Sequence, residues 1–201
     1  ETNIRRTQTW INIPTTTAII GMVARYDPYK DHSNLFSALK ILRDSKKDII
    51  CLLIGTGMND ENKKLKNTLE EYSIGNMVRL LDRKENIHRW FSFMDIHVLS
   101  SISESFPNVL IEAMSCGTPC VVTDVGDTPD IVNNYGWVVP PNDPIKLSEG
   151  IKEAIVLLED DKSREMLSFE CREHVVEMYS LELMTRRYIN LWEDVAASGS
   201  T

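Results

Sequence analysis

Short apolar segments recur along the first two thirds of the chain, and each is followed by a polar loop and then by a segment with helical spacing. Apolar runs of this length are typical of buried strands, and strands that alternate with helices indicate βαβ units around a parallel sheet. We therefore expect an α/β fold with a doubly wound parallel sheet of about six strands. The expected strands are residues 18–24, 49–54, 77–81, 96–99, 120–123 and 137–139.

The segments with helical periodicity lie between the expected strands and after the last one. We expect a lead-in or linker over residues 1–17, one ligand-binding domain over 18–160, and C-terminal helices with a frayed polar tail over 161–201. The expected helices are residues 33–43, 61–72, 85–93, 108–115, 129–132, 144–158, 163–178 and 181–195.

The last expected helix carries an apolar stripe. Such a stripe either packs on the core or lies on a membrane surface. Acidic residues at positions 193 and 194 favour packing against the core. The stripe consists of Tyr188, Leu191, Trp192 and Val195.

The net charge of -8 over 201 residues argues against non-specific nucleic-acid binding, which requires a basic surface. The four cysteines form no C-x-x-C pair, so we expect free, buried thiols in a reducing compartment and no metal site. The histidines show no metal-ligand spacing, and we expect His97, inside a strand, to be a packed core residue. The sequence shows no signal peptide or membrane-length apolar run, and it opens at Glu1 without a Met, as a fragment or a processed piece would.

Several polar residues and glycines follow directly after expected strands. Ligands of such sheets bind beyond the carboxyl ends of the strands, so these loops converge on one edge. Arg25 and Lys30 follow the first strand, Gly55 and Gly57 end the second, and Glu104 follows the fourth. Two cations can neutralise a diphosphate, although a lone Arg or Lys in a loop is usually solvated. The edge is therefore the predicted binding site.

The segment ESFPNVLIE places one carboxylate in a loop and a second inside the helix that follows. Seven residues separate Glu104 from Glu112, and Pro107 suits the first position of a helix. The free backbone N–H groups at the start of this helix form an anion site. Taken alone, Glu112 is typical of a solvent-facing position on an amphipathic helix, but the surrounding pattern favours a ligand contact.

This pattern resembles the nucleotide-sugar site of retaining glycosyltransferases with the GT-B fold, especially the family-four group, the glycosyl transferases group 1. There, the second of two glutamates separated by seven residues opens the motif Glu-Ala-Met-x-x-Gly-x-Pro, which this chain matches with Glu112, Ala113, Met114, Gly117 and Pro119. The resemblance runs from residue 19 to about residue 195. It implies the C-terminal, donor-binding half of an enzyme built from two Rossmann-like domains, with nucleotide sugar bound by residues 18–160.

The resemblance also implies a role for each matching residue. Arg25 and Lys30 would grip the donor phosphates and stabilise the leaving nucleoside diphosphate, and Glu104 would contact hydroxyls of the transferred sugar. These three are the expected catalytic residues, and Glu112 would accept hydrogen bonds from the ribose. The other expected donor-binding residues are Gly21, Gly55, Gly57, Arg83, Ser105, Phe106, Asn108 and Val109.

In retaining transferases of this fold the leaving phosphate assists the incoming hydroxyl, so the protein contributes positioning and electrostatics. The resemblance therefore implies no cofactor and no metal. The alternative for the two glutamates is an acid–base pair of the glycosidase kind, which requires carboxylates that flank one bond.

Three positions bear on how far the resemblance extends. Asp82 stands where relatives have Gly after the third strand, which leaves base contacts by Arg83 open. Asp127 adds a third carboxylate where relatives often have a second Gly. A dinucleotide fingerprint would need Gly at the position of Asp60, which counts against a nicotinamide enzyme.

We expect the donor-binding domain of a retaining hexosyltransferase that takes sugar from a UDP- or GDP-linked donor. A saccharide or lipid-linked acceptor would be held by a missing N-terminal domain, so the isolated domain should bind nucleotide but be nearly inactive. Polysaccharide or glycolipid synthesis in the cytoplasm is the expected setting, with peripheral association at the inner face of the cell membrane as an alternative.

Two other classes of function stay open. The first is a nucleotide-sugar epimerase or a phosphorylase of the same architecture, and a phosphorylase would need a cofactor lysine on the sheet. The second is a non-catalytic module that binds nucleotide or a protein partner. The intact set of Arg25, Lys30, Glu104 and Glu112 argues against a decayed enzyme.

Overall fold

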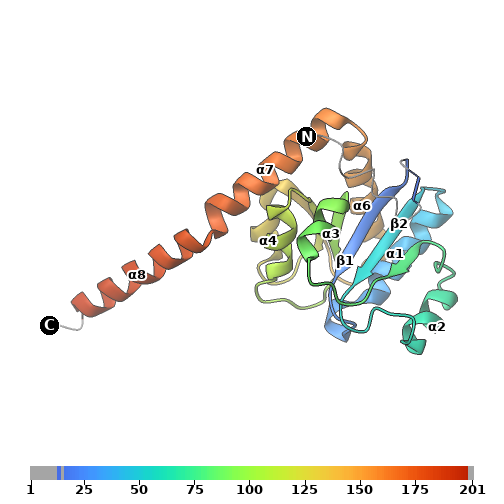
Figure 1. Ribbon diagram of the computed structural model, residues 1–201, viewed down its shortest axis with the longest axis horizontal. Coiled ribbons are helices and arrows are strands. Elements are labelled where there is room, and N and C mark those ends of the chain that lie inside the picture. Colours follow the sequence, from blue (N-terminus) through green and yellow to red (C-terminus); the bar gives the residue numbers. More distant parts are fainter. Residues whose placement is uncertain (1–12, 15, 199–201) are drawn as a thin grey trace.

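A computed structural model describes residues 13–14 and 16–198 (Figure 1). Within them lies a six-stranded sheet with the order β3-β2-β1-β4-β5-β6, in which every neighbouring pair is parallel. The doubly wound sheet expected from the sequence is therefore confirmed. Its strands are β1 (Ala18–Val23), β2 (Ile49–Ile54), β3 (Val78–Leu80), β4 (Ile96–Leu99), β5 (Cys120–Thr123) and β6 (Gly136–Val139).

Helices cover both faces of the sheet, which explains why the strands read as continuous apolar runs. On one face α1 packs against α6, and the edge-to-face rings of Phe36 and Tyr72 place the end of α2 beside α1. On the other face α3 contacts α4, and α4 contacts α5 and α7 (Figure 1). The helices are α1 (His32–Asp44), α2 (Lys63–Glu71), α3 (Ile87–Phe93), α4 (Asn108–Ser115), α5 (Thr128–Val132), α6 (Pro144–Leu158), α7 (Asp161–Tyr179) and α8 (Leu181–Ser198).

Strands β1 and β4 lie side by side at the centre of the sheet. From β1 the chain builds outward through β2 to β3, and from β4 it builds in the other direction through β5 to β6. The loops after β1 and β4 therefore leave the same edge in opposite directions, and this switch point is where doubly wound sheets bind ligands.

The core confirms two expectations about buried reactive side chains. The four cysteines are free, and three of them are buried, namely Cys51, Cys120 and Cys171, whereas Cys116 is half-buried. His97 is fully buried in β4, where the Val23 amide donates to its Nε2 at 3.3 Å. Burial lowers the pKa of His97 to about 3, so the ring stays neutral and accepts this hydrogen bond.

Side-chain caps set several helix boundaries one or two residues away from the expected ones. The carboxylate of Asp31 accepts from the Asn34 amide, and the side chain of Asn62 accepts from the Leu65 amide. Each cap places the first helical residue directly after it. Two short 3-10 helices, Pro28–Lys30 and Asn133–Tyr135, were not expected from the sequence.

The last helix departs most from expectation. Figure 1 shows α8 projecting away from the sheet, and none of its residues is buried. Core packing of its apolar stripe is therefore wrong: Tyr188 is 52% exposed and Trp192 66% exposed. Ser180 has an extended backbone (ψ 151), which breaks the helix and directs α8 outward. The helix also continues to Ser198, beyond the start of the expected frayed tail.

Residues 1–12, 15 and 199–201 lie outside the described part, and so does most of the expected lead-in. Within the part of the chain that the structure describes, no helix has both the length and the apolar character needed to cross a membrane.

Candidate functional site

An ion pair joins the loops after β1 and β4. Lys30 Nζ lies 2.5 Å from Glu104 Oε1, and the Ser101 hydroxyl donates to the same oxygen at 2.6 Å. The side chain of Glu104 is only 10% exposed, and that of Lys30 is 22% exposed. Among the described residues, none donates a hydrogen bond to Glu104 Oε2. The pair thus spans the switch point and keeps one carboxylate oxygen free for a ligand.

Buried hydroxyl groups hold the two loops in place. Ser100 Oγ lies 3.1 Å from the carbonyl oxygen of Lys30 and 3.0 Å from that of Asp31. Thr123, at the end of β5, donates to the carbonyl of Ser101 at 2.5 Å. Because these donors come from the ends of β4 and β5, the sheet itself fixes the backbone on both sides of the ion pair.

The loop after β5 packs directly against the backbone of Glu104. A Cβ added to Gly126, which has φ 53, would lie 2.1 Å from the Glu104 carbonyl oxygen. The next residue, Asp127, donates its amide to the carbonyl of Ser105 at 3.1 Å. Glycine is therefore required at position 126 for this approach, and the exposed Asp127 adjoins the same loop.

Helix α4 begins directly after this loop. Pro107 is its N-cap, and no side chain caps this end of the helix. The amides of Asn108 and Val109 are therefore the groups that an anion would meet. One turn further, Glu112 is exposed, and partial desolvation raises the pKa of its carboxyl.

Two of the expected site residues are not part of the Lys30–Glu104 ion pair. Arg25 is 72% exposed, and its ion-pair partner is Asp27, at 3.1 Å. Gly21 is buried in the middle of β1, where an added Cβ would lie 2.4 Å from Cε of Met94. Gly21 thus makes room for core packing, and the structure does not bring it to the edge.

The glycines after β2 contact the loops that follow β1 and β3. A Cβ on Gly55 would lie 2.1 Å from the Ala24 carbonyl oxygen, and the Gly55 amide donates to the Asp82 carbonyl at 3.1 Å. Gly57 has φ 84 and lies against Tyr26. These contacts hold the ends of β1, β2 and β3 together at the carboxyl edge.

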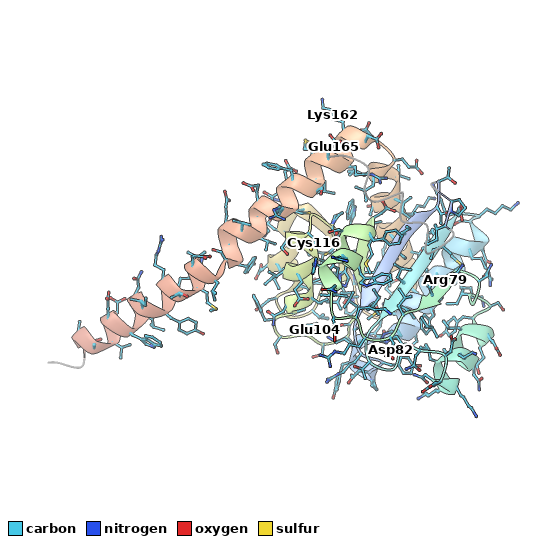
Figure 2. The ribbon with its side chains drawn as sticks, viewed as in Figure 1. Arg79, Asp82, Glu104, Cys116, Lys162 and Glu165 are labelled. Carbon is cyan, nitrogen blue, oxygen red and sulfur yellow. The ribbon has the colours of Figure 1, made fainter. Side chains whose placement is uncertain are left out.

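Asp82 occupies a backbone conformation that favours glycine, with φ 46. This conformation suits the glycine that the family pattern has at this position. A hydrogen bond from Asn59 Nδ2, at 3.2 Å, is the main cause that lowers the pKa of the Asp82 carboxyl. Figure 2 shows Asp82 and Glu104 at one end of the body, opposite Lys162 and Glu165. Arg83 follows Asp82 and is exposed.

The end of α7 also contacts the site loop. The ring of Phe106, 46% exposed, lies 5.9 Å from that of Tyr179, whose hydroxyl donates to the Asp130 carbonyl at 3.2 Å. Sequence reasoning missed Tyr179, and it also missed the roles of Ser100, Ser101 and Thr123. A signal for the serines was present, since two hydroxyl residues follow directly after a buried strand.

The described residues contain no group of three or more His, Cys, Asp or Glu side chains arranged to hold a metal ion. The carboxyl edge of the sheet carries a cation, a helix start without a side-chain cap and two carboxylates. These groups suit a ligand that carries both phosphate and hydroxyl groups.

Comparison with protein families gives one match that covers most of the chain. The sequence model described as "Glycosyl transferases group 1" matches residues 4–174. Curated relatives include N-acetyl-alpha-D-glucosaminyl L-malate synthase of Bacillus anthracis, 29% identical over 74% of this chain and 38% of that protein. Another is UDP-Gal:alpha-D-GlcNAc-diphosphoundecaprenol alpha-1,3-galactosyltransferase of Escherichia coli, 25% identical over 90% of this chain and 46% of that protein. The chain therefore spans less than half the length of these relatives.

Solved structures share the fold over nearly the whole chain. A glycosyltransferase from Rickettsia africae superposes with a TM-score of 0.82 at 24% identity, over 92% of this chain and 49% of that one. HepE of Anabaena, solved in complex with UDP and glucose, superposes with a TM-score of 0.75 at 19% identity, over 89% and 49%. The architecture is thus one Rossmann-like half of a GT-B fold.

Proposed function

The chain belongs to the glycosyl transferases group 1 family, and on that premise we propose that it is the donor-binding half of a retaining glycosyltransferase. The observation that carries the proposal is the Lys30–Glu104 pair beside the uncapped start of α4, at the switch point of the sheet. The proposed reaction moves a sugar from a nucleoside-diphosphate donor to a saccharide or lipid-linked acceptor in the cytoplasm.

The phosphates of the donor would lie between Lys30 and the start of α4. The ammonium group supplies a point charge, and the amides of Asn108 and Val109 supply fixed dipoles where negative charge develops on the leaving diphosphate. Arg25 joins them by exchanging Asp27 for a phosphate, because its exposed side chain is held by a single surface ion pair. These donors supply the positive charge without a metal or a cofactor.

The two carboxylates would bind the two sugars of the donor. Glu112 accepts hydrogen bonds from the ribose, and the raised pKa of its carboxyl reflects a partly desolvated position. Glu104 accepts from hydroxyls of the transferred sugar through Oε2. The protein then acts by positioning and electrostatics, and the leaving phosphate assists the acceptor hydroxyl on the same face. Residues that bind the acceptor would come from the other half of the enzyme.

A uridine nucleotide is the first donor to test. The names of the Escherichia coli relative and of the Anabaena structure include UDP, which supports this choice. Calorimetric titration of this chain with UDP, GDP and ADP, without magnesium, should give binding of one nucleotide. Glu112→Ala should abolish that binding, whereas the control Glu149→Ala on α6 should leave it unchanged. Binding that survives Glu112→Ala would show that the ribose assignment is wrong.

Turnover is a separate question from binding. We expect nucleotide release that depends on an acceptor sugar only when both halves of the enzyme are present. The chain alone should be nearly inactive. Hydrolysis or epimerisation of the donor without any acceptor would instead favour an epimerase or another non-transfer enzyme of this architecture.

A further inference from the structure

The carboxylate of Glu104 already has two donors before any ligand binds. Lys30 Nζ and Ser101 Oγ both contact Oε1, at 2.5 Å and 2.6 Å. We propose that Glu104 makes the phosphate site prefer a nucleotide sugar over the free nucleoside diphosphate, and that Ser101 is the positioning residue that holds it in this role. This inference rests on the proposed function and concerns the same site.

Charge is the first part of the argument. A diphosphate that approaches Lys30 also approaches Glu104, because the two groups are in contact and the carboxylate is only 10% exposed. Repulsion between like charges is strong where little water screens it. The terminal phosphate of free UDP ionises further than the esterified phosphate of UDP-glucose, so UDP carries more negative charge. Glu104 therefore weakens the binding of the free diphosphate more than that of the nucleotide sugar.

Hydrogen bonding is the second part. Since Oε1 is occupied by Lys30 and Ser101, Oε2 is the carboxylate oxygen that remains for a ligand donor. The hydroxyls of a transferred sugar can donate to it, whereas a free diphosphate has no donor to offer at that position. The same carboxylate thus stabilises the bound donor and repels the diphosphate left after transfer, which favours release of that product.

Ser101 fixes the orientation of the Glu104 carboxylate. Its side chain is fully buried, so it acts on a ligand through Glu104. Its backbone is anchored by the hydrogen bond from Thr123 Oγ1. Removing the hydroxyl lets the carboxylate plane turn away from the orientation that presents its second oxygen to a ligand. The discrimination between the two ligands should then decrease, although neither charge is removed.

The first experiment tests the ion pair without any ligand. Acetylation of lysines in this chain is followed by mass spectrometry, with Lys47, which lies 3.4 Å from the exposed Glu159, as an internal reference. Glu104→Gln should speed the labelling of Lys30 about tenfold relative to Lys47, because the neutral amide no longer holds the ammonium. Ser101→Ala should give a smaller increase. Equal labelling of Lys30 in all three proteins would overturn the inference.

The second experiment measures discrimination. Calorimetry compares UDP with UDP-glucose, or GDP with GDP-mannose if the chain binds guanine nucleotides, for the unmodified chain, Glu104→Gln, Ser101→Ala and Ser101→Thr. Glu104→Gln should tighten binding of the free diphosphate and weaken that of the nucleotide sugar, so the ratio of the two affinities should change about tenfold. Ser101→Ala should shift the ratio in the same direction by less, and Ser101→Thr, which keeps the hydroxyl, should restore it.

The outcomes separate this inference from the proposed function. Equal weakening of both ligands by Glu104→Gln would overturn the preference and leave the donor site standing. A chain that binds no nucleotide at all, either alone or joined to the other half of its enzyme, would overturn the proposed function and this inference with it.

Discussion

Two ion pairs of similar burial lie at opposite ends of β4. Asp95 directly precedes the strand and pairs with Arg164 of α7 at 3.0 Å, and Glu104 follows the strand and pairs with Lys30 at 2.5 Å. The acidic partners are 18% and 10% exposed, and the basic partners 23% and 22%. Each pair joins segments far apart in the sequence. Distance and burial alone would give both pairs the same role.

The remaining hydrogen bonds of the two pairs differ. The second oxygen of Asp95 accepts from the Ile19 amide at 2.8 Å, and Arg164 Nε donates to the Leu158 carbonyl at 2.8 Å. The chain thus uses both oxygens of the Asp95 carboxylate. Glu104, at the carboxyl edge of the sheet, keeps one carboxylate oxygen without a donor among the described residues. An ion pair in which both carboxylate oxygens accept hydrogen bonds from the protein stabilises the fold. An ion pair at the carboxyl edge that leaves one carboxylate oxygen without a donor is suited to a ligand.

Acid should produce the largest effect, and it should act through two buried histidines. Burial lowers the pKa of His32, which follows Lys30, to about 4, and that of His97 in β4 to about 3. Between pH 6.5 and 4 the unfolded histidines bind protons that the native ones do not, so the free energy of unfolding falls as the pH falls through this window. Each histidine should remove about 3 kcal/mol by pH 4.

Urea unfolding at pH 7, 5.5 and 4.5 measures this loss. His32→Leu should reduce the pH dependence, and it breaks no hydrogen bond, because the ring nitrogens of His32 have no partner among the described residues. The exposed His88 provides the control, since His88→Gln should leave the slope as it is. A slope that His32→Leu does not change would contradict the assignment.

Breaking the Asp95–Arg164 ion pair should have the next largest effect. Asp95→Ala leaves Arg164 unpaired and the Ile19 amide without its acceptor, so we expect a loss of about 3 kcal/mol in the free energy of unfolding. Urea denaturation checks this, with Glu149→Ala in the exposed Lys146–Glu149 pair as the control that should not move the curve. Nucleotide affinity at neutral pH should stay unchanged. A parallel loss of affinity would contradict the separate roles of the two ion pairs.

Lys30→Ala should act mainly on nucleotide affinity. We expect nucleotide affinity to fall about tenfold or more, because the point charge for the phosphates is lost, while the domain stays folded. Calorimetry and a circular dichroism spectrum measure the two properties on one sample. Lys47→Ala removes an equal charge from an exposed pair and should leave affinity unchanged. Unchanged affinity in Lys30→Ala would mean that the phosphates bind elsewhere.

Thr123→Val should have the smallest effect. The substitution keeps the shape of the side chain but removes the donor to the Ser101 carbonyl, which should cost about 1 kcal/mol of stability. A modest loss of nucleotide affinity should accompany it, because the loop that carries Glu104 is less firmly held. A stability loss with wholly unaltered affinity would show that the anchor serves only the fold.

The sheet and most helices could be predicted because burial on both faces leaves a periodic apolar pattern in the sequence. Helix starts were less certain, since they depend on whether Asp31 or Asn62 turns its side chain toward a backbone amide. The apolar stripe on α8 predicted a helix with one apolar face, but the periodicity of a sequence does not show whether that face packs on the core. The extended backbone at Ser180 decided that outcome.

The candidate site could also be predicted only in part. Parallel strands bring their carboxyl ends to one edge, so the meeting of Lys30 and Glu104 could be expected. The pairing of Arg25 with Asp27 could not, because an exposed side chain chooses among several neighbours. Nor could the hydrogen bonds from Ser100 and Thr123 be read from the sequence, since they join segments that only the folded sheet brings together.

The close approach of Gly126 to Glu104 has a consequence for how this site can diverge. Every amino-acid replacement at position 126 adds a Cβ where the Glu104 carbonyl already stands. Substitution is therefore excluded at that position, although it adjoins the loop that carries Glu104. The exposed side chain of its neighbour Asp127 meets no such barrier, so natural variation or protein design can change the residue there.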